Sequence, residues 1–221
     1  MKSKFSIFNA LFLIYTIILC YVYYLNGGIV LKAATSLGFL LIAFTSAIFV
    51  VSDKRIGRRF ALFMLCGATA SFLGDIILNI DFIIGALIFA LGHIFYFCAY
   101  CSVIKYNKRD FFAGILIFVP SVLIILFYPF FNFGSPLMKA VCIIYALIIS
   151  SMLGKAISLL FQKKQRFISM IFAGSLLFFV SDIALLFYMF SNTGEAANTL
   201  CLLTYFPAQV ILGLSIFEFS E

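Results

Sequence analysis

Residues 167–190, FISMIFAGSLLFFVSDIALLFYMF, form an apolar segment in which Asp182 is the only charged residue. As an α-helix with a rise of 1.5 Å per residue, the segment would be about 36 Å long, and the hydrocarbon core of a bilayer is about 30 Å thick. Lys163, Lys164 and Arg166 directly precede it, as is typical of the cytoplasmic end of a membrane helix. The segment therefore predicts a transmembrane helix that carries a carboxyl group in hydrocarbon.

Apolar runs of similar length fill most of the chain. Of its 221 residues 65% are hydrophobic and only 10% are charged, whereas globular domains carry about 25% charged residues. We predict an all-α fold, a polytopic membrane helix bundle with eight transmembrane helices that forms a single transmembrane domain over residues 1–221. The predicted spans are Ser6–Leu25, Ile29–Val51, Gly57–Ile80, Phe82–Ile104, Phe111–Phe131, Leu137–Phe161, Phe167–Phe190 and Ala197–Phe219.

The basic residues alternate between successive loops. All of them except Lys32 and Lys139 lie before the first predicted span or around every second loop: Lys2, Lys4, Lys54, Arg55, Arg58, Arg59, Lys105, Lys108, Arg109, Lys155, Lys163, Lys164 and Arg166. Positively charged loops stay in the cytoplasm. This alternation predicts that both termini are cytoplasmic, and we expect a multi-pass protein of the cell's inner (plasma) membrane.

The formal net charge of +7 does not indicate a nucleic-acid surface, because the basic residues form short clusters between apolar runs rather than one basic stripe. All six cysteines lie inside apolar runs, where thiols behave as small hydrophobic groups. With a single histidine and no metal-ligand spacing, the sequence favours no metal site, and we expect no cofactor.

Among the ionisable residues within or at the ends of apolar runs, four stand out: Lys32, Asp75, His93 and Asp182. A charged side chain at the centre of a membrane helix costs about 2.5–3.5 kcal/mol on insertion scales. Such residues are kept where they are paired, neutralised or used in function. These four are therefore the first candidates for a functional site.

Each candidate also has a purely structural interpretation. Asp75 lies on a face with Gly67, Ser71 and Asn79, which would pack closely against a neighbouring helix. Asp182 could be satisfied by Lys32 or by hydroxyl groups. His93 could join two helices by a hydrogen bond or share a polar pocket with Asp75. Lys32 could reach the membrane interface, bind a lipid phosphate or pair with one of the aspartates. If His93 shares a pocket with Asp75, or if Lys32 pairs with an aspartate, these residues would belong to one functional pocket.

The ordered combination of these residues resembles the lysoplasmalogenase family, the YhhN-like membrane proteins. The resemblance covers the second to the eighth predicted span, and Ala33 departs from it because many bacterial members have proline there. It rests on Gly74-Asp75, Leu78, Gly85, Phe89, His93, Tyr96, residues Tyr145 to Met152, Gly174, Phe178, Ser181-Asp182, Tyr205 and Gln209.

The resemblance implies an integral membrane hydrolase with eight spans that cleaves the vinyl ether bond of lysoplasmalogens. The products would be a fatty aldehyde and glycerophospho-ethanolamine or glycerophospho-choline, and the partners would be a lysophospholipid substrate and membrane lipids. Vinyl ether hydrolysis needs one carboxyl group that donates a proton and one carboxylate that stabilises an oxocarbenium ion, as in glycosidases.

We predict that Asp75 and Asp182 form this pair, and we count His93 with them as catalytic. The residues expected to position substrate and water are Lys32, Asn79, Tyr96, Tyr145, Ser181, Tyr205 and Gln209.

Two other functions also use membrane aspartates. An intramembrane aspartic protease is disfavoured because Phe72 stands where the G-x-G-D motif requires glycine before Leu73-Gly74-Asp75. A proton-coupled transporter of small molecules or lipids is the stronger alternative, because aspartates in membrane helices also relay protons. Against it, Pro120 and Pro207 are isolated and do not form the paired interruptions of broken transporter helices.

Overall fold

The structure, a computed structural model, describes residues 2–52 and 57–219, with side chains from residue 5 onward. Lys54 and Arg55 lie outside the described residues, as do the side chains of Lys2 and Lys4. The helices are α1 (Lys2–Asn26), α2 (Ile29–Ser52), α3 (Arg58–Ile77), α4 (Phe82–Val103), α5 (Lys108–Phe127), α6 (Pro136–Gln162), α7 (Arg166–Phe190) and α8 (Glu195–Phe219).

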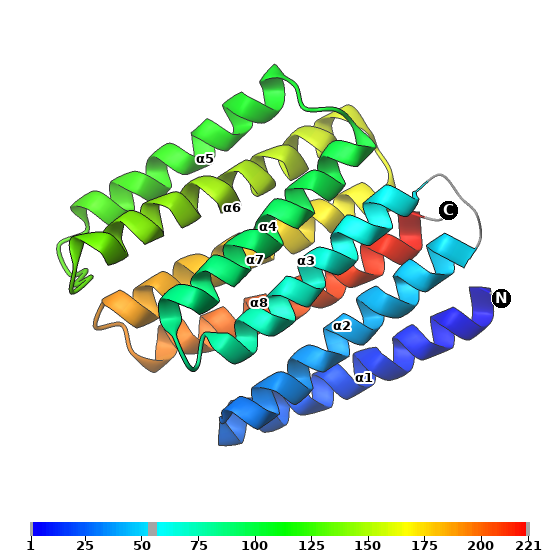
Figure 1. Cartoon of the computed structure of the whole chain (residues 1–221), viewed down its shortest axis with the longest axis horizontal. Coiled ribbons are helices and arrows are strands. Elements are labelled where there is room, and N and C mark those ends of the chain that lie inside the picture. The colour runs from blue at the N-terminus through cyan, green and yellow to red at the C-terminus, as the bar shows by residue number, and fades with distance from the viewer. Residues whose placement is uncertain (1, 53–56, 220–221) are drawn as a thin grey trace.

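The predicted all-α fold with eight spans is confirmed. Each of the eight helices is long and apolar enough to cross a membrane, and the described part of the chain contains no strand. The protein is therefore a multi-pass integral membrane protein. Figure 1 shows both ends of the chain at the same end of the bundle, as an even number of spans requires. The cytoplasmic location of that end remains a prediction.

Six of the helices form a closed ring. Going round it, α2 contacts α3, α3 contacts α4, α4 contacts α6, α6 contacts α7, α7 contacts α8, and α8 returns to α2. The other two helices lie outside the ring, where α5 packs on α6 and α1 packs mainly on α2, at opposite edges of the bundle (Figure 1). The ring encloses the polar side chains that the sequence places in hydrocarbon.

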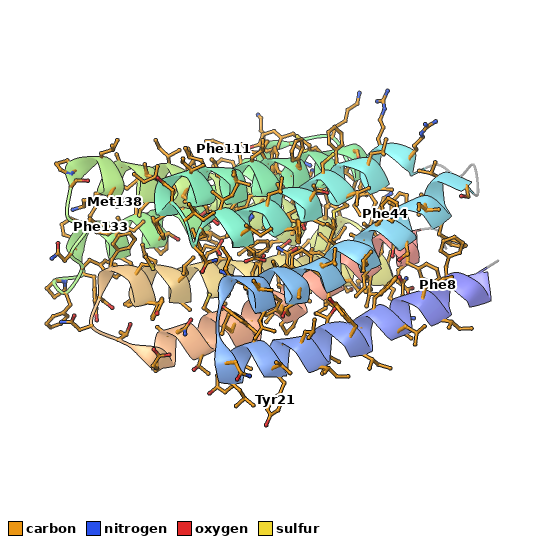
Figure 2. All side chains as sticks on the ribbon, turned by 60° about the horizontal axis from the view of Figure 1, so that its bottom comes forward. Phe8, Tyr21, Phe44, Phe111, Phe133 and Met138 are labelled. Atoms are coloured by element: carbon orange, nitrogen blue, oxygen red, sulfur yellow. The ribbon has the colours of Figure 1, made fainter. Side chains whose placement is uncertain are left out.

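The outer surface of the bundle is apolar. Figure 2 shows Phe8 and Tyr21 on α1 and Phe111 on α5 projecting away from the other helices, and each of them is about half exposed or more. In water such a surface would promote aggregation. In a bilayer the hydrocarbon chains of the lipids cover it.

Helix boundaries follow capping residues rather than the ends of the apolar runs. The helix predicted at Phe111–Phe131 starts earlier, because Asn107 and Asp110 form a reciprocal capping box, and it ends at Phe127. The aromatic residues after Phe127 form a turn. Hydrophobicity alone extended this span too far, because Tyr128, Phe130 and Phe131 are apolar aromatic residues outside the helix.

The α5–α6 pair is held at very short range by two glycines. A Cβ atom on Gly154 would overlap the backbone of Gly114 and would come within 2.9 Å of the carbonyl carbon of Ala113. A Cβ atom on Gly114, in contrast, would find its nearest neighbour, the Cα atom of Ser151, at an ordinary 3.6 Å. Small residues allow such close approach in membranes, where packing rather than the hydrophobic effect holds helices together.

These two glycines provide a matched test of the close approach. We expect Gly154→Ala to lower the free energy of unfolding by about 1–3 kcal/mol, because the added methyl group forces two backbones apart. Gly114→Ala should be neutral or slightly stabilising, because alanine favours the helix and its Cβ makes only ordinary contacts, the nearest at 3.6 Å. Unfolding of both variants in mild detergent checks this, and equal effects would contradict the asymmetry.

A buried ion pair fixes α6 at the end of the bundle where the chain termini lie. Lys155 is fully buried within α6, its Nζ donates to Asp110 Oδ2 at 2.7 Å, and it also donates to the Lys105 carbonyl oxygen at 3.3 Å. The same Oδ2 accepts the backbone N–H of Asn107 at 2.8 Å. Lys155 therefore belongs to the interior, although the sequence analysis counts it with the loop charges.

We expect Lys155→Met to cost about 3–5 kcal/mol of stability, because it leaves the Asp110 carboxylate buried without its counter-charge. The double variant Lys155→Met with Asp110→Asn should recover much of that loss, because no unpaired charge remains. Free energies of unfolding in detergent check this. A double variant as unstable as Lys155→Met alone would show that the unpaired charge is not the cause.

Candidate functional site

Asp75 lies close to the C-terminal end of α3, among donors from α2 and α8. Its Oδ2 accepts the hydroxyl of Ser36 at 2.5 Å and that of Tyr205 at 2.6 Å. The Lys32 Nζ lies 3.6 Å from Oδ1. We call these four residues the Asp75 cluster. The Asp75 side chain is almost completely buried, so these donors replace the water that its carboxyl group would otherwise bind.

Lys32 and Ser36 are four residues apart on α2, so both face the same neighbour. The Lys32 ammonium group neutralises the carboxylate, while 13% of the side chain stays exposed. Of the sequence alternatives for Lys32, pairing with an aspartate is therefore the one that the structure contains. Ser36 was not among the predicted residues, although its spacing from Lys32 is a signal that could have identified it.

Asp182 lies in α7 and is bound by residues of α4 and α6. Its Oδ2 accepts the Tyr145 hydroxyl at 2.8 Å and lies 3.1 Å from His93 Nε2. The same Nε2 is 2.8 Å from the Tyr145 hydroxyl oxygen, so the three groups form a triangle. We call these three residues the Asp182 cluster. A carboxyl, an imidazole and a phenol at these distances are able to exchange protons directly.

The Asp182 cluster is asymmetric in its exposure. The His93 side chain is fully buried, whereas the Asp182 side chain is 12% exposed. The second ring nitrogen of His93, Nδ1, is buried and has no hydrogen-bond partner among the described residues. The cluster therefore presents its carboxyl group outward and keeps its imidazole behind it.

Three aromatic rings link the two clusters. The Phe178 ring lies 4.5 Å from the His93 ring and 5.4 Å from the Tyr205 ring, measured between centroids, and Phe89 packs against both Phe178 and Tyr205. We call Phe89, Phe178 and Tyr205 the aromatic triad. His93 is thus hydrogen-bonded to Asp182. The sequence had suggested that His93 shares a pocket with Asp75.

The two carboxyl groups nevertheless lie in one neighbourhood. Both Asp75 and Asp182 are close enough to interact electrostatically with the Tyr205 hydroxyl. The thiol of Cys201, one turn before Tyr205 on α8, is in range of both carboxyl groups and of Lys32. Cys201 was not predicted as part of this region, because a cysteine in an apolar run gives no distinct signal.

A second polar layer lies deeper in the ring. The Tyr96 hydroxyl donates to Gln209 Oε1 at 2.8 Å, and the Tyr100 hydroxyl lies 2.8 Å from Ser175 Oγ. The Gln209 amide nitrogen is buried without a partner among the described residues. Tyr96 and Gln209, both predicted to position substrate, are therefore brought together. Their hydrogen bond to each other does not involve either carboxyl group.

Asn79 and Ser181 serve the backbone in this conformation. The Asn79 side chain donates to the Asp75 carbonyl oxygen at 2.6 Å and so caps the end of α3. The Ser181 hydroxyl donates to the Phe178 carbonyl oxygen at 2.7 Å, and its oxygen is 3.5 Å from Asp182 Oδ1. Their predicted role in substrate binding is not visible in these contacts and stays a prediction.

An apolar groove leads to the Asp182 cluster. It runs between α4, α6 and α7, with Ile125 of α5 and Leu78 also in its lining, and it is partly open. Asp182 and Tyr145 line it among residues that are otherwise apolar. The Asp75 cluster does not contribute to its lining, so only one of the two carboxyl groups faces this space.

The comparison with known families agrees with this geometry. The model of the YhhN family matches residues 29–216. The chain belongs to the YhhN family. The match begins at the first residue of α2 and ends within α8, so it includes the whole ring and leaves out α1. No curated protein and no solved structure matches the chain.

The YhhN family includes lysoplasmalogenases, so the resemblance found in the sequence is confirmed at the level of the family. The matched region contains both carboxyl clusters and the groove. Family membership supports a hydrolase function, and it does not by itself identify the substrate.

Removing the Tyr145 hydroxyl tests whether the Asp182 cluster is held together as described. We expect Tyr145→Phe to lower the free energy of unfolding by about 1–2 kcal/mol, because Asp182 loses a hydrogen bond inside the ring. Tyr188→Phe is the matched control, because Tyr188 lies on α7 and is 37% exposed. Unfolding in detergent compares the two, and a loss no larger than that of the control would exclude a stabilising Tyr145–Asp182 bond.

Proposed function

We propose that this YhhN family member hydrolyses the vinyl ether bond of lysoplasmalogens, releasing a fatty aldehyde and a glycerophospho-alcohol. The observation that carries the proposal is the pair of carboxyl groups inside the ring, each with a different set of partners. Two carboxyl groups in unlike environments are what acid and electrostatic catalysis at one bond requires. The substrate is a lysophospholipid that reaches the site from the surrounding membrane lipids.

In this mechanism Asp182 is the general acid. It faces the groove, so a substrate there reaches its carboxyl group, whereas Asp75 is enclosed. The Asp182 proton is transferred to the β-carbon of the vinyl ether, where a new C–H bond forms. The π electrons move towards the ether oxygen and leave an oxocarbenium ion. His93 and Tyr145 hold the carboxyl group in place, and Asp182 regains its proton from the attacking water in the next step.

Asp75 supplies negative charge near the oxocarbenium ion. Lys32 and the hydroxyl groups of Ser36 and Tyr205 favour its charged form. Electrostatic stabilisation by fixed groups of this kind is effective in a low-dielectric site because the groups need no reorganisation.

Water completes the reaction. It adds to the oxocarbenium carbon and gives up one proton to the Asp182 carboxylate, which forms a hemiacetal. The hemiacetal then collapses: its hydroxyl gives up a proton and becomes the aldehyde carbonyl, its C–O bond to glycerol breaks, and the glycerol oxygen takes up one proton, so the proton count balances. Tyr96 and Gln209 remain candidates for positioning water, because their polar layer lies next to His93 on α4.

The test is aldehyde release from a lysoplasmalogen by the purified protein in mild detergent. Asp182→Asn should lower turnover by about 10²–10⁴, the usual contribution of acid–base catalysis. Asp75→Asn should lower it by about 10²–10³, the usual cost of removing one electrostatic stabiliser. The matched control is Asp81→Asn. Asp81 caps α4 through its side chain, and asparagine caps helices equally well. We expect this control to keep wild-type turnover.

A folded Asp182→Asn variant with more than about a tenth of wild-type turnover would refute the acid assignment. Proton-coupled transport is the alternative that uses the same carboxyl groups. Uptake of a lysophospholipid into proteoliposomes without any aldehyde release would favour transport over hydrolysis. Aldehyde release by wild type with loss in both aspartate variants would establish the hydrolase.

A further inference from the structure

The groove between α4, α6 and α7 is built from one face of each helix. On α4 it uses Phe82, Ala86 and Phe89, which are spaced by four and three residues and so lie on one side of the helix. On α6 it uses residues between 141 and 149 with the same periodicity. Such a regular lining shows that the groove follows one face of each of these helices.

The groove is polar near Asp182 and apolar along the rest of its length. Along α7 it is lined from Phe179 to Phe190, and Asp182 lies near the start of that stretch. The eight residues from Asp182 to Phe190 correspond to about 12 Å of helix rise. Over that distance α7 contributes only apolar side chains to the groove, including Ile183 and Leu186.

The position of the groove limits what can fill it. Its lining comes mainly from three helices that are long and apolar enough to cross a membrane, and it is partly open. A water-soluble ligand would gain little there, because its polar groups would meet only Asp182 and Tyr145. An aliphatic chain, in contrast, loses nothing by moving from bilayer hydrocarbon into an apolar channel.

We propose that this groove binds the single aliphatic chain of a lysophospholipid and holds the carbon atoms next to its ether oxygen against Asp182. The identity of the polar end of this lipid rests on the proposed function. The groove adds to that function a binding site for the chain and a route of access. The chain enters sideways from the bilayer through the open side of the groove. Its reacting end then meets the Asp182 carboxyl group.

The same geometry explains selectivity for one chain. Ala86 on α4 and Ala146 on α6 line the groove with a methyl group each, and both are at least nine-tenths buried. Larger side chains at these positions would occupy the space of the ligand. A diacyl lipid would have to fit a second chain into or beside the same groove. It should therefore bind much less well than a lipid with one chain.

The experiment uses a photoreactive, non-cleavable ligand, a 1-O-alkyl lysophosphatidylethanolamine with a diazirine in its chain, added to the full-length protein in mild detergent. Cross-links should fall on the groove-lining peptides of α4, α6 and α7. Unlabelled alkyl lysolipid should compete for them, and the same concentration of diacyl phosphatidylethanolamine should not.

Two variants and one control test the position of the chain. Ala146→Leu and Ala86→Leu fill the groove from opposite sides and should lower cross-linking about five- to a hundredfold, the range expected for overpacking. Ala140→Leu adds the same side chain on the exposed face of α6 and should have no effect. Two substitutions on different helices make it possible to separate loss of the ligand site from misfolding of one variant.

Cross-links spread over lipid-facing residues such as those of α1, or equal competition by diacyl lipid, would overturn the proposal and assign the groove to ordinary bilayer lipid. This result is independent of catalysis. Groove-specific cross-links without aldehyde release would remove the proposed function and keep the chain site. Aldehyde release with cross-links outside the groove would do the reverse.

Discussion

A carboxyl group inside a bilayer must find its hydrogen-bond donors in the protein, because the hydrocarbon offers none. This requirement accounts for the arrangement of the helices. Each of the six ring helices contributes a polar side chain to the interior: α2 and α8 bind Asp75 of α3, while α4 and α6 bind Asp182 of α7. The two helices outside the ring, α1 and α5, contribute to neither cluster and are mostly exposed to lipid.

The two clusters solve the same problem in different ways. Asp75 is neutralised by a cation and enclosed, while Asp182 relies on a phenol and an imidazole and faces the groove. Environments that differ this much give two chemically identical groups different properties, which is how acid and carboxylate roles are separated at active sites. The aromatic triad keeps the clusters apart while it leaves both within electrostatic range of Tyr205.

The sequence was sufficient to predict the number of spans, their approximate bounds and the two aspartates, because each rests on a local and costly signal: a run of about 20 apolar residues, or a charge within it. It could not predict which helices are neighbours. The hydrogen bond from Tyr205 to Asp75 crosses 130 residues of chain, and no periodicity carries that information. For the same reason His93 was considered with Asp75 although it binds Asp182, and Lys155 was counted with the loops although Asp110 holds it inside.

The order of the partners along the chain has a consequence for biosynthesis. Lys32 and Ser36 precede Asp75, and His93 and Tyr145 precede Asp182, so each carboxyl group enters the membrane when donors for it have already been synthesised. Only Tyr205 comes late, and at about 5–20 residues per second the ribosome needs roughly 7–26 seconds to make the 130 residues between it and Asp75. During that interval Lys32 and Ser36 are already present to pair with the Asp75 carboxyl group. The ring closes only when α8 docks between α7 and α2, so a chain released before its last helix is complete contains both aspartates but no finished site.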